Sequence, residues 1–181
     1  MSNPDLSLWY AARVAALAAF AVLSASLVTG TALRTSLLAP LARNRAVLEL
    51  HTFLSWLWVP LVGIHIAALL LDGTAQIGLV DTVVPFRVDY APVAVGLGTI
   101  GFLLLLLVGV TSAFRRRLGP RSWRWIHRLS YPMFGLFLLH AQLAGSDFSR
   151  TFISMAGWAT LGAVIMLTGL RLTTGRVRDT G

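Results

Sequence analysis

Five long stretches without a charged residue alternate along this chain with short segments that carry the charges. The stretches cover residues 14–33, 50–71, 90–114, 129–146 and 151–170. About 20 apolar residues in a helix are long enough to cross a hydrocarbon core of about 30 Å. The pattern therefore predicts an all-α, polytopic membrane helix bundle of about five transmembrane helices. With their flanking aromatic and apolar residues, the expected spans lie near residues 9–33, 48–71, 90–114, 125–146 and 151–172.

Composition agrees with a membrane protein, because 56% of the residues are hydrophobic and only 12% are charged. Soluble domains carry about a quarter charged residues. We expect one transmembrane domain over residues 1–181, with no internal repeat. Residues 1–8 carry no basic side chain, so the first apolar stretch is expected to be a retained helix and not a signal peptide.

The arginines predict how the bundle is oriented. All 15 basic residues are Arg, and 12 of them fall in three segments that share one side if the N-terminus is outside. Cytoplasmic loops are enriched in basic residues, so the expected topology is N-out and C-in, in the cell membrane. The net charge is +8, but the arginines sit between apolar blocks. We therefore assign them to topology and lipid headgroups, and exclude nucleic acid as a partner.

The segment of residues 72–89 is the longest connection and is predicted to be external. Its apolar part could lie along the membrane interface as a lid over the outer helix ends. A partly buried connector is the alternative. The chain contains no Cys, which excludes disulfides, iron–sulfur clusters, zinc–thiolate sites and thioether-linked haem.

Four histidines, His51, His65, His127 and His140, are the main candidate functional residues, and all fall within or at the edge of two predicted spans. A single intramembrane His is equally well explained by a hydrogen bond to a neighbouring helix. Four of them would each need a polar partner, and the spans offer few. A metal centre satisfies all four, as intramembrane ionisable residues are usually functional.

Spacing separates these histidines into two sites. They are 14 residues apart in the second span and 13 in the fourth, which is roughly 20 Å along a helix. One span lies between these two, so both run in the same direction. His51 should then face His127 near the cytoplasmic side, and His65 should face His140 near the outer side.

Two imidazoles on facing helices suit the axial positions of a haem iron, whereas zinc sites need three or four close ligands. Haem is therefore favoured over zinc or no metal. A 13-residue spacing does not return to the same helix face, and a kink at Pro132 is expected to realign His127 and His140.

Several other residues are candidates for holding a haem. Glycines would let helices approach a flat ring, although ordinary helix packing explains them as well; they are Gly63, Gly96, Gly98 and Gly101. Arginines at the inner ends of the His spans could pair with haem propionates, although topology also explains them; they are Arg43, Arg45, Arg124 and Arg128. Arg13, near the outer end of the first span, could snorkel or meet an outer propionate.

The two His spacings occur in the segments LHTFLSWLWVPLVGIHIAALLLD and TSAFRRRLGPRSWRWIHRLSYPMFGLFLLH, accompanied by TVVPFRVDYAPVAVGLG and AGSD. Together these segments resemble the ferric reductase-like transmembrane domain family over residues 9–152. That family includes ferric reductases, NADPH oxidases and the haem-binding membrane subunit of a methionine sulfoxide reductase. The resemblance implies two b-type haems, with His51, His65, His127 and His140 as the axial ligands.

The chain departs from this family in two respects. The family usually has six spans where we count five, and about ten residues without a GxGxxG motif follow Arg171. We thus expect no soluble flavin or nucleotide domain and no NAD(P)H oxidation by this chain alone. A flavin or a quinone would come from a separate donor, such as a flavin reductase or quinol.

The resulting hypothesis is a di-haem cytochrome b that passes electrons to an external acceptor, as the membrane component of an oxidoreductase. A methionine sulfoxide reductase partner is one candidate acceptor, and ferric ion or oxygen is another. The first alternative is a haem subunit of a quinone-linked dehydrogenase. The second is a haem-free transporter or scaffold that uses the histidines as a proton relay.

Overall fold

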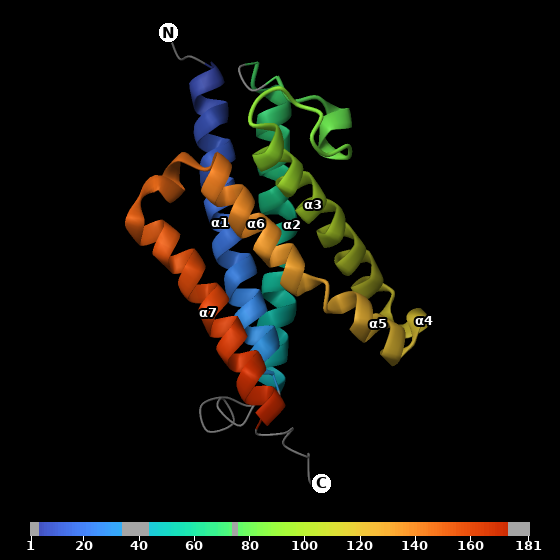
Figure 1. The fold of residues 1–181 in the computed structure, drawn as a ribbon. Helices are drawn as coiled ribbons and strands as arrows, with labels where there is room; N and C mark the ends of the chain where they lie inside the picture. Colours follow the sequence, from blue (N-terminus) through green and yellow to red (C-terminus); the bar gives the residue numbers. More distant parts are fainter. Residues whose placement is uncertain (1–3, 34–43, 74–75, 174–181) are drawn as a thin grey trace.

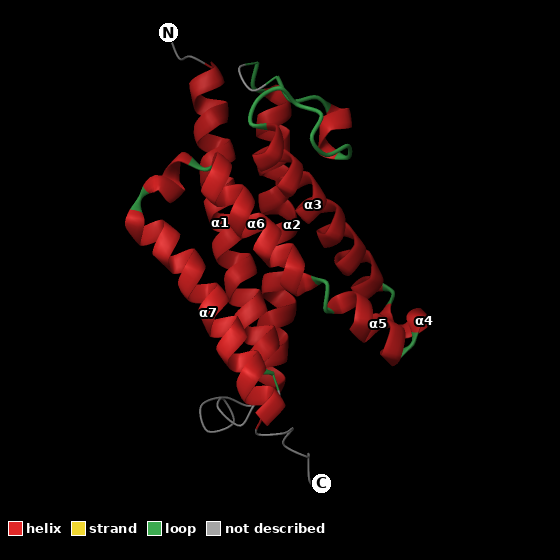
Figure 2. Ribbon diagram, viewed as in Figure 1, coloured by secondary structure: helices red, strands yellow, loops and turns green. Residues whose placement is uncertain are grey.

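The computed structural model of the protein describes residues 4–33, 44–73 and 76–173, which form helices and loops without any β-strand (Figures 1 and 2). The long helices are α1 (Pro4–Ala32), α2 (Asn44–Leu71), α3 (Pro92–Ala113), α6 (Ser130–Ala144) and α7 (Thr151–Thr173). The short segments between them are η1 (Leu79–Thr82), α4 (Arg115–Leu118), α5 (Pro120–His127) and η2 (Ser146–Ser149). The prediction of an all-α membrane helix bundle is confirmed.

Four of these helices, α1, α2, α3 and α7, are long and apolar enough to cross a membrane, judged within the described residues. α3 illustrates why the sequence forms them: Pro92 occupies the first turn, where its missing N–H costs nothing, and no charged residue follows before the helix ends. Large apolar side chains on these helices point outward. On α2, for example, the side chains of Phe53 and Trp56 are 61% and 64% exposed. In a multi-pass membrane protein such side chains face lipid.

The fourth predicted span is not one continuous helix in the structure. Instead of one helix over residues 125–146, the chain forms α5, a turn at Arg128 and Leu129, and then α6 with 15 residues. The expected kink at Pro132 is absent as well, since Pro132 lies in the first turn of α6. The carbonyl of Arg128 accepts from the N–H of Tyr131 at 3.1 Å. The helix is thus interrupted at Arg128 and Leu129, just before Pro132, which has no N–H to donate to the Arg128 carbonyl.

The long helices form two antiparallel pairs. α1 packs along α2 and α3 packs along α6, while α7 lies against α1 (Figure 1). The two His-bearing helices, α2 and α6, therefore have their main contacts with other helices and not with each other. We call the end with the start of α1 and residues 72–91 the outer end, and the end with α4 and α5 the inner end. Which of them faces the cytoplasm stays a prediction.

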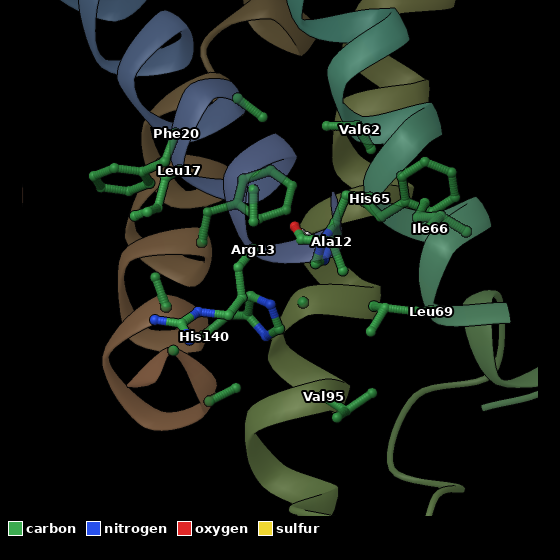
Figure 3. A pocket seen from close by; sticks show the side chains of 18 of the residues that line it. Ala12, Arg13, Leu17, Phe20, Val62, His65, Ile66, Leu69, Val95 and His140 are labelled. Carbon is green, nitrogen blue, oxygen red and sulfur yellow. Dashed lines mark hydrogen bonds between the residues drawn. The ribbon is translucent and has the colours of Figure 1, made fainter. Parts of the chain in front are cut away.

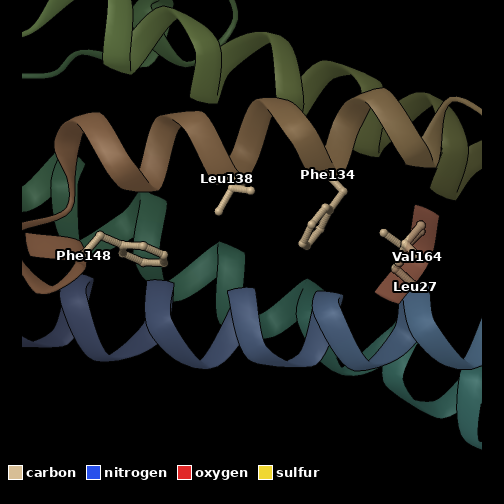
Figure 4. Close-up of a cluster of buried hydrophobic side chains, with 5 residues drawn as sticks. All are labelled: Leu27, Phe134, Leu138, Phe148 and Val164. Atoms are coloured by element: carbon tan, nitrogen blue, oxygen red, sulfur yellow. The ribbon is translucent and has the colours of Figure 1, made fainter. Parts of the chain in front are cut away.

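A cluster of buried apolar side chains fixes α6 against α1 and α7. Its members are Leu27, Phe134, Leu138, Phe148 and Val164 (Figure 4). Phe134 and Leu138 are four residues apart, so they share one helix face, and both are fully buried. His140 is two residues further along, about 200° around the helix. Packing of one face of α6 into this core therefore turns His140 toward the other side.

The described part of the outer connection, residues 76–91, is held on α3. The hydroxyl of Thr99 donates to the carbonyl of Asp81 at 3.1 Å, and Arg87 forms an ion pair with Asp81 at 3.2 Å. Phe86 has a φ of 64° and lies against Gly96, where any Cβ would come within 2.2 Å of the Phe86 ring. Gly96 therefore serves the seating of this loop. The approach of Gly96 to a haem ring, which the sequence suggested, stays a prediction.

Candidate functional site: two histidine pairs

The inner histidine pair consists of His51 from α2 and His127 from the last residue of α5. Their ring centres are 6.2 Å apart and the rings are nearly perpendicular, at 85°. Two imidazoles bound in line to one metal ion, each about 2 Å from nitrogen to metal, place their ring centres about 6 Å apart. The inner pair therefore has the spacing of two axial ligands.

The outer pair, His65 on α2 and His140 on α6, lines a single cavity of about 460 Å³ (Figure 3). The cavity lies in the space between the two antiparallel helix pairs. Its lining is mainly apolar and includes Leu17, Phe20, Val62, Ile66 and Leu69. A volume of this size falls in the range of small-molecule and cofactor sites, about 300–1,000 Å³.

Each histidine is held through its Nδ1 atom. The Nδ1–H groups of three of them donate to backbone carbonyls: His51 to Ser26 at 2.8 Å, His65 to Ala12 at 2.9 Å and His140 to Ala94 at 2.8 Å. The Nδ1 of His127 lies 3.3 Å from the hydroxyl of Ser112. A carbonyl only accepts, so Nδ1 carries the proton in the first three. Nε2 then has a lone pair that is available to bind a metal. Metal-ligating histidines have the same arrangement, in which the other ring nitrogen donates a hydrogen bond.

Two glycines give the imidazoles room. A Cβ at Gly98 on α3 would come within 2.7 Å of the His140 ring, and a Cβ at Gly30 on α1 within 2.8 Å of the His51 ring. Gly101 is in similarly close contact with Phe137. By contrast, a Cβ added at Gly63 or Gly109 would meet no atom within 4 Å, so neither glycine makes such a contact. Gly63, which the sequence suggested beside His65, therefore contacts neither imidazole, and its role beside a haem stays a prediction.

The donor set fits a haem better than a metal ion held by protein alone. Within the described residues, no group of three or more His, Cys, Asp or Glu is placed to hold a metal ion. Each site instead offers two imidazoles, and a porphyrin supplies its own four nitrogens. The ring spacing at the inner pair, the cavity at the outer pair and the free Nε2 atoms all suit a bis-His haem.

Arg13 lies in the wall of the outer cavity and forms an ion pair with Asp147 from η2. Its Nε–H donates to the carboxylate at 2.9 Å, and its guanidinium lies 4.0 Å from the centre of the Trp9 ring. These hydrogen bonds hold the pKa of Asp147 below its usual value. Asp147 therefore competes with a haem propionate for Arg13, although the remaining N–H groups of the guanidinium could still donate to one.

The arginines suggested for the inner propionates are dispersed. Arg45 pairs with Glu49 at 2.9 Å on an exposed face of α2, and the guanidinium of Arg128 lies over the Trp125 ring at 4.7 Å. Arg124 is exposed on α5. Arg43 lies outside the described residues. Their role as propionate partners remains a prediction.

The outer connection takes part in the cavity wall, because Ile77, Asp81 and Thr82 line it. Of the two interpretations offered by the sequence, a lid and a connector, these contacts favour the lid. Sequence reasoning did not find the groups that orient the histidines, which are Ser26, Ser112 and the carbonyls of Ala12 and Ala94. It also missed Gly30, which gives the His51 ring space, and the pairing of Asp147 with Arg13. A backbone acceptor leaves no trace in the sequence, since every residue has a carbonyl.

Residues 15–138 match the family described as ferric reductase like transmembrane component, which is more than half of the chain. The chain belongs to the ferric reductase-like transmembrane family. The matched region includes His51, His65 and His127, and His140 follows two residues after it. No solved structure gives a significant match. Membership in this family indicates transmembrane electron transfer, in agreement with the resemblance seen in the sequence.

Proposed function

We propose that this chain is a di-haem b-type cytochrome that carries electrons from a cytoplasmic or quinol donor to an extracytoplasmic acceptor across the cell membrane. The observation that carries the proposal is the arrangement of the four histidines. They form an inner and an outer pair, each joining α2 to α5 or α6, and three of the four have a proton on Nδ1 that leaves Nε2 free for a metal. His51 and His127 would hold one haem, and His65 and His140 the other.

A bound haem supplies one-electron exchange between ferric and ferrous iron. With both imidazoles of a pair bound to its iron, neither site would keep a position open for oxygen or substrate. The histidines thus restrict each centre to electron transfer. Reaction with the acceptor would take place at the haem edge or on a partner protein.

The protein residues position and insulate this path. His51 and His65 are 14 residues apart on α2, about 21 Å along the helix, and this covers most of a hydrocarbon core of about 30 Å. The apolar side chains of the outer cavity, among them Phe20, Val62 and Ile66, keep water away from the imidazoles. The hydrogen bonds on Nδ1 keep each ring in one orientation.

Within the family, a methionine sulfoxide reductase partner is one candidate acceptor at the outer end, and ferric ion or oxygen is another. The alternative with the same cofactors is a haem subunit of a quinone-linked dehydrogenase, in which electrons run inward. Both directions use the same path through the two histidine pairs.

Electron transfer across vesicles tests this proposal. Purified, haem-loaded protein is reconstituted into liposomes that enclose ferricytochrome c, and dithionite is added outside. We expect the enclosed cytochrome to be reduced much faster than in empty liposomes. His51→Ala and His140→Ala should each return the rate to that of empty liposomes, while Gly109→Ala should leave it unchanged.

A wild-type rate equal to that of empty liposomes would overturn the proposal, and so would unchanged transfer in both His variants. Haem content is measured on the same samples. Folded wild-type protein that cannot be loaded with haem would favour the haem-free transporter or scaffold.

A further inference from the structure

His127 differs from the other three histidines in what it meets at Nδ1. The other three donate to backbone carbonyls at 2.8–2.9 Å, and His51 has the Ser26 hydroxyl at 3.2 Å in addition to its carbonyl. The Nδ1 of His127 instead lies 3.3 Å from the hydroxyl of Ser112 in the last turn of α3. A hydroxyl at this longer distance is a weaker acceptor than a carbonyl at 2.8 Å. The inner pair therefore contains one ligand whose second nitrogen is only weakly engaged.

The same hydroxyl has a second partner, Trp123. The indole Nε1–H of Trp123 is 3.2 Å from the Ser112 oxygen, and an indole can only donate. Trp123 and His127 are four residues apart and lie on one face of α5, and their rings are 5.0 Å apart with a tilt of 30°. The Trp123 side chain thus lies over the imidazole of His127 and also donates to the Ser112 oxygen that His127 would use as its acceptor.

Two donors compete for this oxygen when His127 binds a metal. Coordination through Nε2 keeps the proton on Nδ1, so both the imidazole and the indole would donate to Ser112. Hydrogen bonds polarise one another, and two donors on one acceptor weaken each other. The competition leaves the imidazole less electron-rich than one that donates to a carbonyl, and a less electron-rich ligand stabilises ferric iron less.

The charges around the two pairs act in the same direction. Six arginines occur between residues 115 and 128, and no Asp or Glu occurs between residues 90 and 146. At the outer end, Asp72, Asp81 and Asp147 line the cavity together with Arg13. Positive charge near an iron centre favours its reduced form, since that form carries one positive charge less.

We propose that Ser112 and Trp123 are positioning residues for the inner site: Ser112 is the hydrogen-bond acceptor of His127, and Trp123 weakens this bond by donating to the same hydroxyl, which makes the inner haem the more easily reduced of the two. This inference rests on the proposed function, because it presupposes a haem at each pair. An electron from the donor would then settle at the inner site, and transfer to the outer site would be the thermodynamically uphill step.

Redox titration of the purified, haem-loaded full chain tests the inference. The titration is done in a His65→Ala background, where only the inner haem is expected, and in the wild type for comparison. Ser112→Ala removes the acceptor, so the inner reduction equilibrium should shift three- to tenfold toward the ferrous form, about 28–59 mV for one electron. Trp123→Phe keeps a ring over the imidazole but removes the competing donor, so a shift in the opposite direction is expected.

Two controls separate this effect from a general loosening of α5. Trp125→Phe changes an exposed Trp on the same helix and should leave the inner potential where it is. Ser112→Thr keeps the hydroxyl and should keep the wild-type potential. A merely structural role for Ser112 and Trp123 would move Ser112→Ala and Trp123→Phe in the same direction.

Shifts of equal sign for Ser112→Ala and Trp123→Phe, or no shift in either, would overturn the inference. So would an outer haem with the higher potential in the wild type. Each of these results still shows two bound haems and leaves the proposed function standing. Wild-type protein without haem would instead defeat the proposed function itself.

Discussion

The two histidine pairs use the same ligands but are built from different parts of the chain. At the outer pair, both imidazoles donate to main-chain carbonyls, and α1, α3 and the connection of residues 72–91 enclose the cavity. At the inner pair, His127 meets a side-chain hydroxyl and lies at the end of the short helix α5, among exposed arginines.

The difference shows which parts of each site depend on residue type. Any residue that keeps the helix intact at position 12 or 94 would still present a carbonyl to His65 or His140. Only Ser or Thr at position 112 presents a hydroxyl to His127. We therefore expect substitutions at positions 12 and 94 to leave the hydrogen bonds of the outer pair in place, and substitutions at position 112 to change the electronic properties of the inner site.

The largest expected effect comes from removing a ligand at one pair. His65→Ala should reduce the haem content from two per chain to one by deleting the outer haem, and His127→Ala should delete the inner one. Haem per chain and the visible spectrum of purified protein measure this. Loss of both haems in a folded single variant would show that the two pairs are not independent sites.

Filling the space at one glycine should have the next largest effect. Gly98→Ala places a methyl group 2.7 Å from the His140 ring and should displace that ring from the Ala94 carbonyl. Loss of an outer partner of a metal-bound His typically costs 10–100-fold in affinity, so the affinity of the outer site for haem should fall by about that factor.

Haem titration into the apoprotein measures the effect, and two variants sharpen the comparison. Gly30→Ala should weaken the inner site instead, because its methyl would meet the His51 ring at 2.8 Å. Gly109→Ala on α3 meets nothing within 4 Å and serves as the matched control. Equal affinities in Gly98→Ala and Gly109→Ala would contradict the assignment of Gly98 to the outer site.

A smaller effect is expected from pH at the outer end. The hydrogen bonds from Arg13 lower the pKa of Asp147 in the folded protein. Its stabilising contribution is therefore fully present above the ordinary carboxyl pKa of about 3.9, and it is lost as the pH falls through the lowered pKa.

Thermal unfolding in detergent between about pH 3 and pH 6 measures this contribution. Asp147→Asn should lower the Tm at the upper end of that range and reduce the pH dependence. Glu49→Gln, which alters an exposed pair with Arg45, is the control and should behave like the wild type. An identical pH profile in wild type and Asp147→Asn would show that Asp147 makes no such contribution.

The smallest effect is expected for Arg45→Gln at the inner end. This pair with Glu49 is exposed and spans one helical turn, so its removal should change the Tm very little. Inner haem content should stay at the wild-type value. A marked loss of inner haem would show that Arg45 serves a propionate, as the sequence suggests.

The helices and the His-bearing segments could be predicted because their signals are local. Charge-free stretches of about 20 residues leave few alternatives to a membrane helix. The direction of the spans indicated which histidines face each other, and the structure brings His51 and His127 together. The family resemblance, based on the same segments, is confirmed over residues 15–138.

Other features could not be predicted because they depend on tertiary contacts. The turn between α5 and α6 replaces the expected helix over residues 125–146, so rotation about one helix axis does not relate His127 to His140. Arg13 and Asp147 are 134 positions apart, and nothing in the sequence pairs them. The carbonyls that orient His65 and His140 carry no sequence signal at all.

The most direct test of the central claim is the reduced-minus-oxidised visible spectrum of the purified chain, recorded together with haem per chain. The account predicts two haems per chain with a low-spin, b-type spectrum, and one haem in His65→Ala. A folded chain that binds no haem, or one that keeps two haems without His65, would contradict it.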